Sequence, residues 1–384
     1  METGLKGAAR CSVWRLVGYN TMDMSKKVIL LVIDGLGVGA APDAHLYGDC
    51  GSNTFLSVAK QGIKLPNTLK LLFDGCVTAR LQPVSKGKDT TTGHFELAGL
   101  VLDKPFPTYP HGFPKAVIGE LERAFGLKLL GNRPASGTQI IEEFGEEHLK
   151  DGKPIVYTSA DSVLQIACHV KPFALERLYQ ICQIARDVMQ GEHAVSRIIA
   201  RPFDGKPGSF FRTANRKDFS LPPPAPTLLD RLAKHGKRTF AVGKVYDIFS
   251  GRGIERHYPA KDNREVFEQT LKAAGEIGEG LVFANFVDTD MLYGHRNDTD
   301  GFRRCVEELD TFLPGLLAAV SSNDLLIITA DHGCDPATPS TDHSREYVPL
   351  IATGNIIKKA PLHRGTQKGF YYVNNLIETF FGIK

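Results

Sequence analysis

The sequence predicts an α/β fold in which a mainly parallel β-sheet is flanked by helices and a smaller α+β domain is inserted into the chain. Short apolar runs alternate with longer helical patterns in the first and last parts of the chain, and the middle part is richer in Pro and Gly. The 384 residues, 42% of them hydrophobic, also leave room for about two domains with buried cores.

Five apolar runs are the expected strands of the sheet. Each is short and almost wholly apolar, which is typical of strands covered on both faces. The runs are Val28–Ile33, Arg238–Val242, Leu281–Phe286, Leu325–Thr329 and Val348–Ala352. Helical patterns lie between them, and several open with Asn or Thr, which are good helix N-caps. The expected helices are Asn53–Gln61, Asn67–Asp74, Thr227–His235, Arg264–Ala274 and Gly301–Val320.

The middle of the chain, residues 101–221, has shorter and more mixed elements. Its clearest elements are two strands and a helix, at Ile155–Thr158, Arg197–Ala200 and Leu175–Met189. It ends in a proline-rich run, residues 221–226, which cannot lie inside a helix or a central strand. We therefore expect a discontinuous catalytic core of residues 26–100 and 222–384, with residues 101–221 inserted as a cap domain.

Composition narrows the classes of partner. The net charge is only +3 and the charges are scattered, which does not indicate a nucleic-acid-binding protein. The apolar runs are far shorter than the ~20 residues that span a bilayer, so we expect no membrane partner. The seven cysteines form no C-x-x-C pair, which favours a reducing, cytoplasmic location.

Residues 1–25 have two interpretations. They carry Lys6, Arg10 and Arg15 against two acidic residues, a pattern that an organelle-targeting segment can show, but they have no apolar core of a secretory signal. The preferred interpretation is a disordered leader before a start at Met22 or Met24.

Asp34 directly follows the run Val28–Ile33. In open α/β sheets ligands gather at the carboxyl ends of strands, so Asp34 is a candidate metal ligand, although an isolated Asp there is more often a turn residue. Gly37 and Gly39 resemble part of a dinucleotide-binding fingerprint, but Pro42 stands where its last glycine belongs. A nicotinamide site is therefore not expected.

Thr90 lies in a Gly- and Lys-rich turn that leads into a helical pattern. Exposed backbone N–H groups and positive charge in such a turn suit an incoming phosphate. A hydroxyl beside a divalent cation can ionise and act as a nucleophile. Taken alone, the stretch fits a Thr-rich helix N-cap better.

Two further stretches place Asp and His after expected strands. Asp290 and His295 follow Leu281–Phe286. Asp288, which lies between this strand and Asp290, is expected to be structural. The others, which come after Leu325–Thr329, are Asp331, His332 and His343. Oxygen and imidazole ligands suit Mn²⁺, Zn²⁺ or Mg²⁺, and they are too numerous for one tetrahedral ion. A two-metal site is therefore the hypothesis.

Six motifs together resemble the alkaline phosphatase superfamily and, within it, the phosphopentomutase family. They are Asp34-Gly35, Gly87-Lys88-Asp89-Thr90-x-x-Gly93-His94, Tyr157-Thr158-Ser159-Ala160-Asp161-Ser162, Arg197-x-x-Ala200-Arg201-Pro202-Phe203, Gly243-Lys244 and Asp331-His332-Gly333-Cys334-Asp335. The resemblance extends from about residue 26 to the end. It implies an alkaline-phosphatase-like core with a cap, and interconversion of (deoxy)ribose 1-phosphate and (deoxy)ribose 5-phosphate.

The resemblance also implies the cofactors and the site residues. Two Mn²⁺ ions per chain are expected, the first bound by Asp290, His295 and His343 and the second by Asp34, Asp331 and His332. Thr90 would carry the phosphoryl group and contact the metals, after priming by glucose 1,6-bisphosphate or a similar sugar bisphosphate. The expected substrate contacts are Lys88, Ser159, Asp161, Arg197, Arg201 and Lys244. A monomer is the default expectation.

Rival functions share much of this pattern. A metal-dependent phosphomonoesterase or a phosphoglycerate mutase would use the same metal ligands, and the insert with Ser159 and Asp161 is the feature that favours the pentomutase. An inactive metal-binding interaction protein is disfavoured, because every expected ligand and Thr90 are present.

Overall fold

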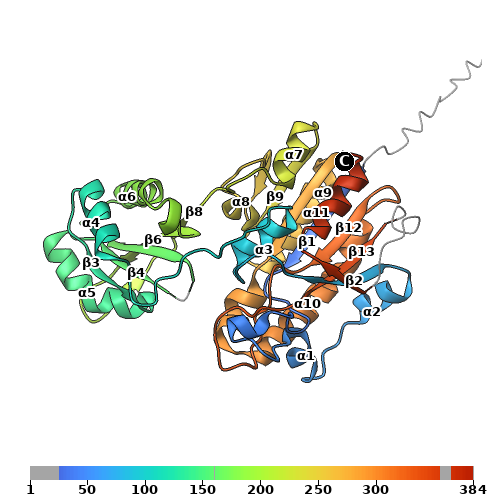
Figure 1. The fold of residues 1–384 in the computed structure, drawn as a ribbon, viewed down its shortest axis with the longest axis horizontal. Helices are drawn as coiled ribbons and strands as arrows, with labels where there is room; N and C mark the ends of the chain where they lie inside the picture. Colours follow the sequence, from blue (N-terminus) through green and yellow to red (C-terminus); the bar gives the residue numbers. More distant parts are fainter. Residues whose placement is uncertain (1–25, 160, 355–364, 384) are drawn as a thin grey trace, which may run out of the picture.

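The computed structural model describes residues 26–159, 161–354 and 365–383. The leader expected at residues 1–25 lies outside the described residues. All five expected strands are found in one eight-stranded sheet with the order β10-β9-β11-β1-β12-β13-β2-β14 (Figure 1). Its strands are β1 (Lys26–Ile33), β2 (Val77–Gln82), β9 (Arg238–Val242), β10 (Arg256–Tyr258), β11 (Glu279–Phe286), β12 (Leu325–Thr329), β13 (Val348–Thr353) and β14 (Gly365–Lys368). Five neighbouring strands of this order, β10, β9, β11, β1 and β12, are mutually parallel, which confirms the mainly parallel sheet.

The register of the central strands brings their carboxyl ends to one edge. Ile33 of β1 pairs with Phe286 of β11, and Val32 pairs with Thr329 of β12. The turns that follow these three strands therefore begin side by side. This register is what places Asp34 beside residues that are about 250 and 300 positions away in the sequence.

Helices cover both faces of the sheet, as the apolar strands predict. Alternate residues of β1 face opposite ways. Val28 and Leu30 pack in the core cluster that includes α3, α7 and α11, whereas Ile29 and Leu31 pack in the cluster that includes α2, α9 and α10. The helices of this domain are α1 (Thr54–Ala59), α2 (Pro66–Phe73), α3 (Thr90–Leu97), α7 (Leu228–Lys234), α8 (Val245–Ile248), α9 (Asn263–Glu276), α10 (Thr299–Ala318) and α11 (Tyr372–Phe381). Three short helical turns lie at Ala44–Tyr47, Thr289–Tyr293 and Gly294–Arg296.

Helix starts agree with the sequence where a side chain caps the backbone. Asn53 caps α1, since its Oδ1 accepts a hydrogen bond from Leu56 N at 3.0 Å. Asn67 is not a cap, because α2 begins one residue earlier at Pro66. The N–H groups of Asn67 and Thr68 instead donate to the carboxylate of Asp310 on α10, at 3.0 and 2.7 Å.

A second sheet of six strands forms from the middle of the chain (Figure 1). Its strands are β3 (Leu130–Pro134), β4 (Ile155–Thr158), β5 (Val163–His169), β6 (Arg197–Asp204), β7 (Phe211–Arg212) and β8 (Lys217–Ser220), and its helices are α4 (Lys115–Phe125), α5 (Gly137–Asp151), α6 (Leu175–Val188) and a short turn at Gly191–His193. We propose residues 101–221 as the cap domain, because these elements all lie within that range. Within the described parts of the chain, we find no helix with the length and apolar character needed to cross a membrane.

Candidate active site

Asp34, Asp331 and His332 converge at the edge of the large sheet. Asp34 follows β1, and the other two follow β12. His332 Nε2 lies 3.3 Å from Asp34 Oδ1 and 3.4 Å from Asp331 Oδ2. All three residues are buried. Their ligand atoms are close enough together to hold one cation.

Asp290, His295 and His343 form a second group beside the first. His295 Nε2 lies 3.2 Å from Asp290 Oδ2, and His343 Nε2 lies 3.6 Å from Asp290 Oδ1. Asp290 lies in the short turn of π-helix Thr289–Tyr293, an irregularity that is frequent at functional sites. The rings of His343 and His332 are 4.0 Å apart, so the two groups are continuous.

Several ligand atoms of this cluster have no hydrogen-bond partner within the described residues. They are buried, and they are Asp34 Oδ1, Asp290 Oδ1, Asp331 Oδ2 and His343 Nε2. A buried carboxylate oxygen without a partner is costly, so structures keep such atoms when they bind a cation. Three of the four are carboxylate oxygens and one is an imidazole nitrogen, a donor set that suits Mn²⁺ or Zn²⁺. The residues therefore fit the two-metal hypothesis.

In the absence of metal, electrostatics favours protonated imidazoles beside ionised carboxylates in this cluster. Burial would lower the pKa of His332, but Asp331 and Asp34 raise it to about 10. The pKa of His295 is also raised, to about 9, because the hydrogen bond to Asp290 outweighs burial. Burial acts against the charge on Asp290, yet His343 and His295 hold the pKa of that carboxyl well below its ordinary value. Without metal, protons on the imidazoles balance the carboxylates, so metal binding must release them.

Asn285 supports one of the candidate ligands by a hydrogen bond, and His94 lies beside another. Asn285, at the end of β11, donates from Nδ2 to Asp34 Oδ2 at 3.0 Å. His94 Nδ1 lies 3.1 Å from Asp331 Oδ2. A polar Asn inside an apolar strand was the available signal for the first. His94 lies within the quoted Thr90 motif, where no chemistry was assigned to it.

Thr90 is the first residue of α3, and its side chain points at the metal ligands. Its Oγ1 is 3.2 Å from His332 Nε2. The competing interpretation of Thr90 as a helix cap does not hold, because Asp89 is the N-cap and accepts a hydrogen bond from Thr92 N at 3.1 Å. The Thr90 hydroxyl is therefore free of that role and lies within reach of a cation held by Asp34, Asp331 and His332.

The loop that precedes Thr90 is anchored by Arg345. This side chain is only 2% exposed, pairs with both carboxylate oxygens of Asp43, and donates to the carbonyls of Ser85 and Gly87 at 2.8 and 2.6 Å. Arg345 follows His343 by two residues, so one segment supplies a candidate ligand and fixes the loop that precedes Thr90. The sequence reading had assigned it no role.

A cavity of about 630 Å³ opens between the metal ligands and the cap. It brings together nine of the expected residues, namely Thr90, Ser159, Asp161, Arg197, Arg201, Lys244, Asp290, His295 and His343. Lys88 does not line it. Its Nζ lies 3.1 Å from Asp49 and 3.3 Å from Asp342, so the structure places this residue in an ion-pair network at the nucleophile loop.

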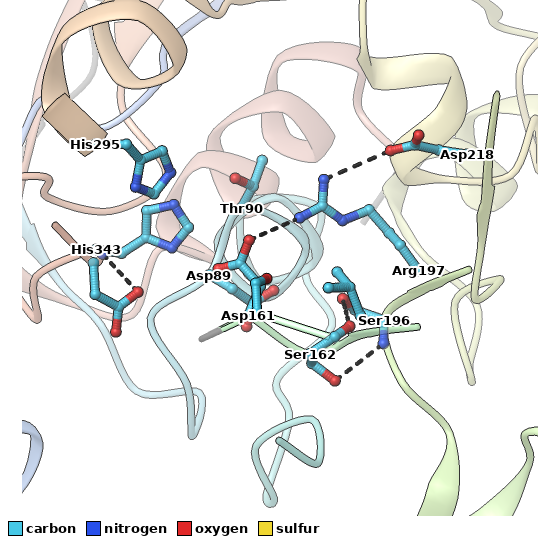
Figure 2. Close-up of polar contacts among 12 residues, drawn as sticks. Asp89, Thr90, Asp161, Ser162, Ser196, Arg197, Asp218, His295 and His343 are labelled. Atoms are coloured by element: carbon cyan, nitrogen blue, oxygen red, sulfur yellow. Dashed lines mark hydrogen bonds and ion pairs between the residues drawn. The ribbon is translucent and has the colours of Figure 1, made fainter. Parts of the chain in front are cut away.

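The cap side of the cavity is a row of ion pairs (Figure 2). Arg197 lies between Asp161 at 3.4 Å and Asp218 at 3.7 Å. Asp218 in turn binds Arg216 at 2.7 Å. Burial raises the pKa of Asp161, but His343 and Arg197 outweigh it, and the pKa lies below its ordinary value. Asp218 and Arg216 were not among the expected contacts.

Cys334 lies close to the ligands but is a poor one. Its Sγ groups with Asp290 and His295. Burial, and then the charge of Asp290, raise the pKa of this thiol far above its ordinary value. Only the thiolate is a good metal ligand, so Cys334 is a poor candidate for one.

Comparison with known proteins matches residues 26–384 to the model of the metalloenzyme superfamily. The chain is 51% identical over 375 residues to the phosphopentomutase of Carboxydothermus hydrogenoformans, covering 94% of this chain and 96% of the relative. It is 49% identical to the phosphopentomutase of Caldanaerobacter subterraneus subsp. tengcongensis, covering 94% and 95%. Among solved structures, the PH0037 protein of Pyrococcus horikoshii is similar in fold, with a TM-score of 0.50 at 16% identity over 94% of this chain and 98% of that one.

Proposed function

Since the chain belongs to the metalloenzyme superfamily and, within it, to the phosphopentomutases, we propose that it interconverts (deoxy)ribose 1-phosphate and (deoxy)ribose 5-phosphate through a phosphorylated Thr90. One observation carries the proposal. Thr90 Oγ1 lies 3.2 Å from the candidate metal ligand His332 and, at the same time, lines the cavity that the cap closes. A nucleophile at that junction can reach both a cation and a sugar.

The metal roles follow the two groups of ligands. In the proposal, Asp34, Asp331 and His332, whose ligand atoms lie close together, would hold one Mn²⁺. Asp290, His295 and His343 would hold the other, with Asp290 at 3.2 Å from His295 and 3.6 Å from His343. When bound, such ions neutralise the charge of the transferring phosphoryl group and favour the ionised hydroxyl. Asn285 would keep the carboxylate of Asp34 in place, whereas the His94 ring makes its hydrogen bond with Thr90 O at 2.9 Å.

The transfer itself needs two exchanges at Thr90. In the priming step, Thr90 Oγ1 attacks one phosphorus of a sugar bisphosphate such as glucose 1,6-bisphosphate and loses its proton, the bond from that phosphorus to the sugar oxygen breaks, and the sugar monophosphate leaves. The free hydroxyl of a pentose monophosphate then attacks the phosphorus, its proton leaves, and the bond from phosphorus to Thr90 Oγ1 breaks, which gives a pentose bisphosphate. Thr90 Oγ1 next takes the other phosphoryl group, and the isomeric monophosphate is released.

The cap wall would bind and orient the pentose. Arg197 of the cap and Lys244 of the core both line the cavity and can donate to phosphate or to sugar hydroxyls, and Lys244 Nζ lies 4.0 Å from Asp34 Oδ2. Asp161 stays ionised and can accept from a hydroxyl. By covering Thr90, the cap would also limit the access of water, and this matters because hydrolysis of phospho-Thr90 would make the enzyme a phosphatase.

The test is a product balance. The chain is incubated with Mn²⁺, a trace of glucose 1,6-bisphosphate and ribose 1-phosphate, and ribose 5-phosphate and free phosphate are both measured. We expect ribose 5-phosphate to dominate and Thr90→Ala to abolish it. Free phosphate as the main product would instead establish a phosphomonoesterase and refute the mutase.

A further inference from the structure

Glu346 is a buried carboxylate that belongs to neither group of candidate metal ligands. The residue is only 1% exposed, and four donor groups converge on its two oxygens. Gly39 N donates to Oε2 at 3.0 Å, and Ser344 Oγ donates to Oε1 at 2.7 Å. Thr54 donates twice, from its N to Oε2 at 3.0 Å and from its Oγ1 to Oε1 at 2.9 Å. None of the four donors is charged, so the buried carboxylate depends on these hydrogen bonds.

The donors lie in segments that are far apart in the sequence, and two of these segments also carry candidate metal ligands. Ser344 directly follows His343. Gly39 lies in the loop that follows β1, five residues after Asp34. Thr54 is the first residue of α1. The Glu346 carboxylate therefore fastens the loop of Asp34 and the start of α1 to the segment of His343.

The same hydrogen bonds extend to the turn that carries His332. Thr54 Oγ1 not only donates to the carboxylate but also accepts from Cys334 N at 3.1 Å. Gly333, which directly follows His332, exchanges two backbone hydrogen bonds with Ser344, at 3.1 and 2.7 Å. Each side-chain donor to Glu346 is therefore also bonded to the turn after β12, or belongs to a residue that is.

Glycines leave the space that this carboxylate occupies. A Cβ at Gly37 would overlap Glu346 Oε2, and a Cβ at Gly333 would lie 2.7 Å from Oε1. Gly37 and Gly39 are the pair that resembles part of a dinucleotide-binding fingerprint. In this fold Gly37 makes room for the carboxylate and Gly39 donates its N–H to it. The pair is thus explained by Glu346.

We propose that Glu346 is a positioning residue, whose carboxylate holds the loops of Asp34, His332 and His343 together and so keeps their ligand atoms at distances that suit a cation. The inference rests on the proposed function, because it assigns Glu346 a part in holding the two Mn²⁺ ions. Groups that orient metal ligands without touching the ion commonly change metal affinity by about 10- to 100-fold.

The test compares two buried carboxylates, one beside the ligand loops and one away from them. Glu346→Gln replaces an oxygen that accepts hydrogen bonds by an NH₂ group that cannot, and Mn²⁺ affinity should fall by about 10-fold or more. The matched control is Asp310→Asn. Asp310 is 4% exposed, accepts from the N–H groups of Asn67 and Thr68, and lies in no candidate metal group of the described residues. This control should lower folding stability and leave Mn²⁺ affinity unchanged.

A second variant removes one donor and keeps the carboxylate. Thr54→Val preserves the shape of the side chain and deletes the hydroxyl that links Glu346 to Cys334. We expect Mn²⁺ affinity to fall by about 3-fold, since one hydrogen bond is lost and the backbone donor remains. Affinity is measured by competition with a metal indicator, and stability by urea unfolding of the metal-free protein.

The combined pattern decides the role of Glu346. Lower Mn²⁺ affinity in Glu346→Gln and Thr54→Val, with unchanged affinity in Asp310→Asn, supports positioning. Unchanged affinity in the first two variants, or an equal loss in Asp310→Asn, overturns it. If Glu346→Gln does not fold, Thr54→Val against Asp310→Asn decides between the same two results. Failure of the unmodified chain to form ribose 5-phosphate would refute the proposed function separately, because the metal titration requires no turnover.

Discussion

The two walls of the cavity are built in different ways. On the core wall the side chains come mainly from turns that follow strands, and Asp290 and His343 are nearly inaccessible, at 6% and 4% exposed. On the cap wall they come from strands or their ends, and Arg197 and Arg216 are 16% and 39% exposed. The core wall is held by neighbouring polar groups, whereas the cap wall is held by ion pairs within itself. Substitutions on the core wall should therefore abolish activity, whereas substitutions on the cap wall should lower activity by degrees.

Thr90→Ala should have the largest effect. It removes the hydroxyl that lies 3.2 Å from His332 Nε2, and we expect kcat for ribose 5-phosphate formation to fall by about 10⁴-fold or more. Thr90→Ser, which keeps a hydroxyl, is the matched variant and should retain more activity. Full activity of Thr90→Ala would remove the nucleophile from the mechanism.

Asp290→Asn should have the next largest effect, through the metal. The change removes the charge that faces His295 and His343, and we expect Mn²⁺ affinity to fall by about 100-fold or more, measured by competition with a metal indicator. Asp288→Asn is the control, because Asp288 Oδ2 accepts from Asn263 N at 2.8 Å and lies outside the candidate metal groups. It should cost about 1 kcal/mol of folding stability and leave metal affinity unchanged. Equal metal loss in both variants would contradict the assignment.

The core wall could be predicted from sequence largely because its ligands follow apolar strands. A buried parallel strand can be recognised in the sequence by its apolar composition, and ligands bind at the carboxyl ends of such strands. Asp34, Asp290 and Asp331 could therefore be identified as candidate ligands. The role of Arg345 could not be predicted, since its partners Ser85 and Gly87 are more than 250 residues away and no local pattern connects them. The last two strands at one side of the sheet, β2 and the edge strand β14, were missed because β2 mixes polar and apolar residues and β14 has no apolar side chain.

The cap wall was predicted less completely for a physical reason. Arg197 and Arg201 belong to a recognisable motif, but Asp218 and Arg216 reach the cavity only because β8 pairs antiparallel with β6, with Asp218 opposite Ile199. That register depends on tertiary structure. Lys88, expected at the substrate, instead pairs with Asp49 and Asp342.

Arg197→Gln should have a moderate effect that separates the two walls. It breaks the ion pairs to Asp161 and Asp218, and we expect kcat/KM to fall by about 10- to 100-fold while Mn²⁺ affinity is unchanged. Steady-state kinetics and metal titration on the same preparation measure both. Loss of metal binding in this variant would show that the walls are not independent.

The smallest effect should be a pH dependence confined to the core wall. In metal-free protein the folded pKa values of His332 and His295, about 10 and about 9, lie above the ordinary value of 6.5. Their contribution to stability is therefore complete below pH 6.5 and is lost as pH rises through 9 to 10. Urea unfolding of metal-free protein should show falling stability over this window, and saturating Mn²⁺ should abolish the fall. Stability of the metal-free protein that rises over the window would contradict the arrangement.

The central claim is that Thr90 carries the phosphoryl group between the two walls. Its most direct test is to incubate the chain with Mn²⁺ and glucose 1,6-bisphosphate, quench it with acid, and locate phosphate by mass spectrometry of its peptides. We predict a phosphate on Thr90 that disappears when excess ribose 1-phosphate is added and ribose 5-phosphate forms. Continued ribose 5-phosphate formation with Thr90 unmodified, or with phosphate on another residue, would contradict the account.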